Sequence, residues 1–264
     1  MKELFRSIFI REDGEQLNKK KELINKVVVF LFVVGVIKFA FSSLEYPYNW
    51  TGILETYWYK FLIGFLMTLV ISIFSLVASL FIGVLLVAGQ KSSFIPFNYF
   101  SKGFTEIIRG TPLIVQIYIF FYVIGTAFHI NNRYVMGVLI MAVFSGAYVA
   151  EIVRAGIESI EKVQLETAKA LAFTKSQTYR YIIIPQVIKR VMPPLAGQFA
   201  SLIKDSSLLS IIAVNEFTKN VQEVDSLTFS PIENYCILAV GYLILTYPIS
   251  HLSKYLEKRF SYGD

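Results

Sequence analysis

The chain has 264 residues, of which 55% are hydrophobic and only 17% are charged. Apolar runs of membrane-spanning length recur along it, a pattern that soluble domains avoid. The formal net charge of +6 does not indicate nucleic-acid binding, because the basic residues gather in particular loops between the apolar runs. The single cysteine, Cys236, excludes a disulfide framework within the chain. These features predict an all-α integral membrane protein.

Six transmembrane helices are predicted, each approaching the roughly 20 residues that cross a hydrocarbon core. They follow a polar N-terminal tail, residues 1–26, and no cleavable signal peptide is expected. In chain order the predicted spans are 27–41, 61–87, 112–128, 135–150, 195–214 and 232–249. The second span carries small residues at helical spacing, which predicts close packing against another helix. These residues are Gly64, Thr68, Ser72, Ser75, Ser79 and Gly83.

The basic residues also predict an orientation. Most of the 25 Lys and Arg residues precede the first span or follow the second, fourth and sixth spans. The alternate loops carry only Lys60, Arg133 and Lys219. Because short loops rich in Lys and Arg stay on the cytoplasmic side, both termini are predicted to be cytoplasmic.

The fifth predicted span is unusual, because Lys204 and Asp205 lie near its middle. A charged side chain at the bilayer centre costs about 2.5–3.5 kcal/mol on insertion scales. Such groups either mark a functional pathway or are satisfied by neighbouring helices, and the sequence leaves both interpretations open. With the adjacent Ser206, they are the candidate residues of a translocation pathway.

Catalytic and metal-binding chemistry is not indicated. The chain has no G-x-x-x-x-G-K-[ST] loop for phosphate binding, and His129 and His251 are far apart. No acids, bases or metal ligands gather in one pattern, so no catalytic residue, metal or cofactor is predicted. Glu151 and Arg154, three residues apart at the end of the fourth span, are predicted to form an ion pair or helix-end anchor.

The segment 164–185, QLETAKALAFTKSQTYRYIIIP, is polar but lies between apolar runs. It predicts a helix–turn–helix: a first helix around 166–171, then a capping box formed by Thr174 and Gln177. Pro185 is predicted to end or bend the second helix. A structured polar hairpin between spans indicates a docking surface for a partner.

This segment resembles the signature loop of ATP-binding-cassette (ABC) importer permeases. The resemblance lies in the spacing of Glu166-Thr167-Ala168, Ala172, and Ile182-x-Ile184-Pro185. Ala172 stands where the family has glycine, which can hold a positive φ at the turn. The turn is therefore expected to be either more helical than in the family or slightly strained.

Other blocks resemble the polar amino acid subfamily of these permeases. They are Arg109–Leu113 with Val115-Gln116, Ser145–Tyr148 with Ala150-Glu151, and Lys204–Ser210. Pro112 is expected at the first position of a helix, with Thr111 as its N-cap.

The resemblance implies a type I importer permease core over 61–259, preceded by one extra helix, 27–41, and containing a cytoplasmic coupling loop, 151–193. It implies a non-enzymatic subunit in a prokaryotic cell membrane. The implied partners are cytoplasmic ATPase subunits, an extracytoplasmic solute-binding protein and a second permease subunit, identical or related. The implied ATPase-contacting residues are Glu166, Thr167, Ala168, Leu171, Ala172 and Phe173. The alternative is an autonomous ion-coupled secondary transporter that uses Lys204 and Asp205; a membrane enzyme is disfavoured.

Overall fold

The computed structural model describes residues 9–10 and 18–261, so most of the predicted tail, 1–26, lies outside the described residues. The chain forms two compact units, residues 1–48 and 49–264. In the first, helix α2 (Lys19–Ser42) begins after Asn18, whose side chain accepts a hydrogen bond from the backbone N–H of Lys20. None of the residues of α2 is buried, and its apolar residues surround the helix, as expected of a lipid-facing span.

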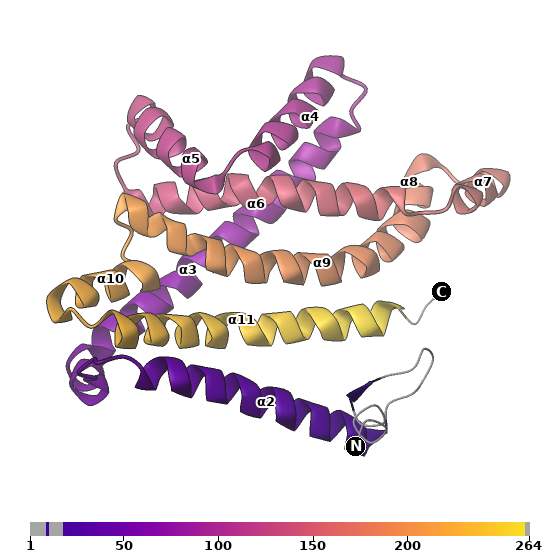
Figure 1. The fold of residues 1–264 in the computed structure, drawn as a ribbon. Helices are drawn as coiled ribbons and strands as arrows, with labels where there is room; N and C mark the ends of the chain where they lie inside the picture. Colours follow the sequence, from indigo (N-terminus) through magenta and orange to yellow (C-terminus); the bar gives the residue numbers. More distant parts are fainter. Residues whose placement is uncertain (1–8, 11–17, 262–264) are drawn as a thin grey trace. The chain divides into compact units, whose positions relative to one another are not determined.

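The second unit is a helical bundle (Figure 1). Its first half contains α3 (Trp50–Gln90), α4 (Ile95–Gly110), α5 (Leu113–Tyr118), the π-helical turn η1 (Ile119–Gly125) and α6 (Arg133–Glu158). Its second half contains α7 (Lys162–Ala170), α8 (Lys175–Thr178), the π-helical turn η2 (Tyr179–Ile183), α9 (Ile184–Asp205), the 3-10 helix η3 (Ser206–Ile212), α10 (Phe217–Thr228) and α11 (Pro231–Ser261).

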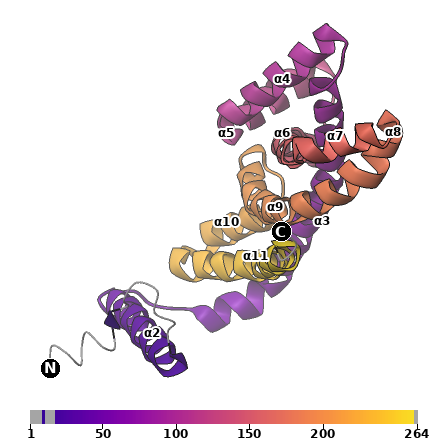
Figure 2. The same cartoon turned by 90° about the vertical axis from the view of Figure 1, so that its right-hand side faces the viewer.

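Helix α6 lies at the centre of this bundle. It packs on α3 and α9, and α11 packs on the other side of α9. Figure 2 shows α4 and α5 together on one side of α6, with α9 and α11 on the other. The main apolar core gathers residues of α3, α5, α6, α9 and η3, among them Ile71, Ile117, Met141, Leu202 and Leu209.

The predicted small-residue face of α3 is confirmed, since all six of its residues are buried. A Cβ atom at Gly83 would lie 2.4 Å from Cγ1 of Val149, and one at Gly146 would lie 2.7 Å from Cγ2 of Ile82. Both glycines therefore allow α3 and α6 to approach more closely than larger residues would permit.

By length and composition, four helices of the described part of the chain could cross a membrane: α2, α3, α6 and α11. The number rises to five if α4 and α5–η1, which are bent by 113° relative to each other, are counted as one span. Helix α9 is not among them, because polar residues such as Lys189, Arg190 and Gln198 make it less apolar. Six crossings stay a prediction.

Several predicted boundaries need correction. The fifth predicted span, 195–214, corresponds mainly to α9, which begins earlier, at Ile184, and continues through Pro193 and Pro194. Thr111 is the C-cap of α4 and not an N-cap, and Pro112 occupies the N-cap position of α5. The reason is a hydrogen bond from Oγ1 of Thr111 back to the carbonyl oxygen of Ile107, 2.8 Å, which ties Thr111 to the preceding helix.

The sequence also did not reveal Glu216, which is completely buried at the start of α10. Its carboxylate accepts hydrogen bonds from the backbone N–H groups of Thr218 and Lys219, at 2.9 and 2.8 Å, and from the hydroxyl of Tyr242 at 2.9 Å. Glu216 therefore caps α10 and joins it to α11. An acidic residue in a polar segment reads as a surface residue, so only the fold shows this role.

Candidate functional site

The α7–α8 hairpin (residues 162–178) extends beyond the ends of α6 and α9 (Figure 1). The predicted capping box is confirmed at the start of α8. Oγ1 of Thr174 accepts a hydrogen bond from the backbone N–H of Gln177 at 3.2 Å, and Oε1 of Gln177 accepts one from the backbone N–H of Thr174 at 2.8 Å. The two short helices are thus held at a defined turn although neither is long enough to be stable alone.

The turn itself is strained at Ala172, whose φ is 57°. The N–H of Ala172 bonds to the carbonyl oxygen of Lys169, and the N–H of Phe173 bonds to that of Ala168, both at 2.9 Å. These two bonds are the Schellman pattern that ends many helices, with its left-handed residue normally glycine. Of the two expectations for this position, strain and not a more helical turn is what the structure shows.

Replacing Ala172 by glycine is expected to stabilise the hairpin by about 1 kcal/mol, because glycine adopts this φ without a Cβ clash. The added stability should appear as slower hydrogen exchange of the backbone amides of residues 171–174 in the purified protein. The matched control, Ala170→Gly in the last turn of α7, should destabilise the hairpin instead. Equal exchange rates in wild type and Ala172→Gly would contradict the strain.

The predicted ATPase-contacting residues of the hairpin differ in their exposure to solvent. Glu166, Thr167, Leu171 and Ala172 are exposed, and the side chain of Leu171 at the tip is 65% exposed. Phe173 is half-buried, and Ala168 is fully buried. An exposed leucine at the tip of a rigid turn is available to a partner, whereas the methyl group of Ala168 lies inside the hairpin.

The base of the hairpin is anchored to α9. Leu165 packs against an apolar cluster that includes Ile160, Ile183 and Val187. Next to it, Nε2 of Gln186 donates a hydrogen bond to Oε1 of Gln164 at 2.6 Å. A force on the hairpin is therefore transmitted to α9 through packed side chains.

Pro185 was predicted to end or bend the second helix, and the structure shows that the helix does not end there. Helix α8 continues through the π-helical turn η2 into α9, and Pro185 lies in the first turn of α9. A proline has no N–H to donate to the preceding turn of a helix. The wider π turn at Tyr179–Ile183 accommodates this missing bond, so the chain stays helical from the hairpin into the bundle.

Lys204, Asp205 and Ser206 lie together where α9 changes into the 3-10 helix η3. Lys204 is exposed on the outside of this subunit, Asp205 is half-buried, and Ser206 is buried with its hydroxyl donating to the carbonyl oxygen of Ile203. Within the described residues, neither Lys204 nor Asp205 forms a salt bridge. Ionisable side chains within a membrane protein's apolar helices are candidates for a solute pathway by default.

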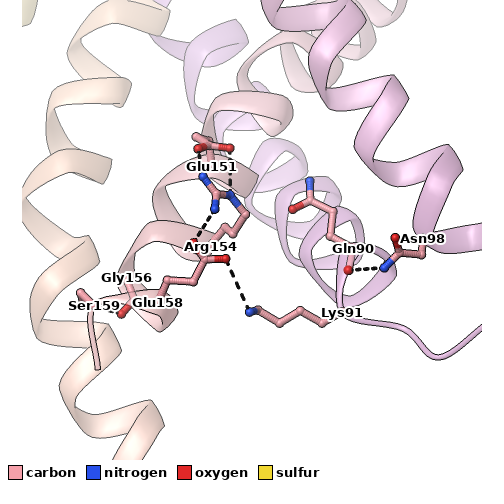
Figure 3. A network of polar contacts seen from close by, with 8 residues as sticks. All are labelled: Gln90, Lys91, Asn98, Glu151, Arg154, Gly156, Glu158 and Ser159. Atoms are coloured by element: carbon pink, nitrogen blue, oxygen red, sulfur yellow. Dashed lines mark hydrogen bonds and ion pairs between the residues drawn. The ribbon is translucent and has the colours of Figure 1, made fainter. Parts of the chain in front are cut away.

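The ion pair predicted between Glu151 and Arg154 is confirmed, with Nε of Arg154 3.2 Å from the Glu151 carboxylate (Figure 3). Two further pairs extend it along the end of α6: Arg154 with Glu158, and Glu158 with Lys91, the last at 4.0 Å. From α4, Nη1 of Arg109 lies 3.1 Å from the same Glu151 carboxylate. The sequence did not show Arg109 and Lys91 as partners, because they come from other segments of the chain than α6.

Fold and site together indicate the membrane component of a transporter, with apolar helices, charges where α9 passes into a 3-10 helix, and a projecting polar hairpin. The chain belongs to the family of binding-protein-dependent transport system inner membrane components, whose family model matches residues 79–262. It is therefore a multi-pass permease subunit of the ABC importer class and not an enzyme. The alternative of an autonomous ion-coupled transporter finds no support in this membership.

Curated relatives agree with this assignment. The chain is 35% identical over 196 residues to the probable glutamine ABC transporter permease protein GlnM of Bacillus subtilis, covering 74% of this chain and 91% of the relative. It is 37% identical over 200 residues to the glutamine transport system permease protein GlnP of Escherichia coli K12, covering 74% of this chain and 90% of that protein.

Solved structures confirm the predicted type I permease fold. A chain of an amino acid ABC transporter crystallised with histidines matches with a TM-score of 0.76 and 32% identity, over 81% of this chain and all of that chain. A chain of the methionine transporter MetNI matches with a TM-score of 0.59 over 80% of this chain and 98% of its own length. At 16% identity this second likeness concerns the fold alone.

Proposed function

We propose that this chain is the membrane permease of an ABC importer for a polar amino acid, and that its α7–α8 hairpin docks on a cytoplasmic ATPase subunit. The observation that carries the proposal is the hairpin itself: a capped, rigid turn with an exposed tip, in a chain of this family without a phosphate-binding loop of its own. A transporter that needs ATP and cannot bind it must receive the energy from a partner through such a surface.

The docking surface consists of Glu166, Thr167, Leu171 and Ala172, with Phe173 beneath them and Ala168 supporting the turn from inside. The apolar tip would enter a groove of the ATPase, and Glu166 at the rim would set its orientation. The continuous helix from α8 into α9 gives this contact a direct path into the bundle.

A second permease subunit, identical or related, completes the pathway, and a solute-binding protein delivers the amino acid at the outer face. The polar amino acid class rests on the glutamine permeases among the relatives and on the amino acid transporter among the solved structures. The basic loops support a cytoplasmic position of both termini, which reporter fusions at residues 1 and 264 would test.

The test is co-purification. The permease, expressed with the ATPase from the same transport system, should be isolated as a complex in mild detergent. Deletion of residues 164–174 should abolish the complex while the remaining permease stays monodisperse. A full-length permease that never retains an ATPase, or a hairpin deletion that retains it as well as wild type does, would contradict the proposal.

Replacing Lys204 by methionine is expected to lower the rate of amino acid uptake about tenfold or more, because the exposed ammonium group at the α9–η3 junction would face the pathway between the two permeases. Uptake into proteoliposomes that contain the full complex would measure it. The matched control, Lys219→Met in α10, should retain the wild-type rate. Equal rates for both variants would exclude Lys204 from the pathway.

A further inference from the structure

The charged residues at one end of the second unit form a single connected network. Glu151 of α6 holds Arg154 of its own helix and Arg109 of α4 at the same time (Figure 3 shows the α6 part). Arg154 continues to Glu158, and Glu158 approaches Lys91 just after α3. The guanidinium of Arg109 also lies over the ring of Tyr148 on α6, 5.7 Å from its centroid. The network therefore joins α3, α4 and α6.

This network ends at the base of the α7–α8 hairpin. Glu158 is the last residue of α6, and Ser159 follows it directly. From α9, Nη1 of Arg190 donates to the carbonyl oxygen of Ser159 and lies 2.7 Å from its hydroxyl. Both chain segments that lead to the hairpin are thus tied to the same turn. The base of the hairpin is therefore joined to the end of α6, and Glu151 lies about two helical turns before that end.

At its other end, the network reaches the elbow between α4 and α5, the 113° bend at Gly110–Pro112. Arg109 stands directly before this bend. The elbow is held by local hydrogen bonds, since Nε2 of Gln116 donates to the carbonyl oxygen of Ile108 at 2.6 Å and to Oγ1 of Thr111 at 2.9 Å. These bonds make the elbow one local unit, which also packs in the apolar core beside α6. Among the described residues, its ion pair to α6 is the one between Arg109 and Glu151.

The network borders a polar cavity of about 520 Å³ between α3, α4 and α6, which Lys102 and Glu106 also line. The side chains of Arg109 and Glu151 are 38% and 28% exposed. Ion pairs with this access to water contribute only about 0–1 kcal/mol to stability. The fold therefore does not depend on them, and their position between hairpin and elbow is the more informative property.

We propose that Glu151 is a positioning residue for transport, which holds Arg109 and Arg154 together and so makes the α4–α5 elbow follow the hairpin. The inference rests on the proposed function. If the carboxylate is lost, the ATPase still binds the hairpin and hydrolyses ATP, but the elbow no longer follows each cycle. Fewer amino acid molecules then cross the membrane for each ATP hydrolysed.

The experiment compares amino acid uptake with ATP hydrolysis in proteoliposomes that contain permease, ATPase and binding protein. Glu151→Gln should lower the number of molecules transported per ATP at least about fivefold and leave the hydrolysis rate within about twofold of wild type. Arg109→Ala, which removes only the α4 side of the link, should do the same, and Glu151→Asp should restore most of the ratio. The control is Lys102→Gln, which should match wild type. Lys102 lines the same cavity but forms no salt bridge in the described part of the chain.

Parallel losses of uptake and hydrolysis in Glu151→Gln and Arg109→Ala would show a merely structural role and overturn the inference. An unchanged number of molecules transported per ATP in both variants would also overturn the inference about Glu151. In that case, ATP-driven uptake by the wild type would still support the proposed function. A wild type without any ATP-driven uptake would overturn the proposed function, and the inference with it.

Discussion

Replacing Gly83 by leucine is expected to destabilise the folded permease by about 3 kcal/mol or more, which is a large fraction of the total stability of a folded protein. Even a Cβ atom at this position would lie 2.4 Å from Cγ1 of Val149 and 3.1 Å from the backbone nitrogen of Ala150. A backbone atom cannot turn aside as a side chain can, so α3 and α6 would have to separate. The yield of monodisperse protein in detergent and its melting temperature measure this effect.

Gly103→Leu is the matched control for this variant. A Cβ atom at Gly103 in α4 meets nothing within 4 Å, and leucine favours a helix more than glycine does, so the same substitution there should not destabilise the protein. If Gly83→Leu melts at the temperature of wild type, the close approach of α3 and α6 is not required for the fold.

Replacing Leu171 by aspartate is expected to weaken binding of the ATPase by about 2 kcal/mol, roughly thirtyfold. The leucine is exposed at the tip of the α7–α8 hairpin, and a carboxylate there would lose its water shell in an apolar groove. A titration of the detergent-solubilised permease with the isolated ATPase measures the affinity.

Phe229→Asp provides the control, because Phe229 is another exposed apolar residue at a helix end, 83% exposed after α10. In the predicted topology Phe229 lies on the outer side of the membrane, opposite the hairpin, so the substitution should leave the affinity for the ATPase unchanged. Wild-type affinity in Leu171→Asp would show that the tip of the hairpin lies outside the interface.

The features that could be predicted from the sequence have local or periodic signals. The small residues of α3 recur at helical spacing, and Thr174 and Gln177 stand at the separation that a capping box requires. Helix α4 escaped prediction because its buried stripe contains Ser101 and Thr105, so no apolar run marks it. The pattern of small polar residues facing a neighbouring helix became visible only in the folded chain.

Contacts between distant segments could not be predicted at all. Glu151 and Arg154 are close in sequence and were recognised as a pair, whereas Arg109 reaches the same carboxylate from another helix. The helix that continues through Pro185 is a related case. A missing N–H breaks a regular α-helix, but the sequence does not show that a π-helical turn can precede the proline and keep the helix continuous.

We expect this chain to transport an amino acid only when an ATPase acts on the α7–α8 hairpin. The decisive measurement is uptake of radiolabelled glutamine into proteoliposomes, with permease, ATPase and binding protein reconstituted together and ATP supplied on the hairpin side. Uptake should require ATP and all three components, and it should disappear when residues 164–174 are deleted. Uptake by the permease alone, driven by an ion gradient without ATP, would contradict this expectation.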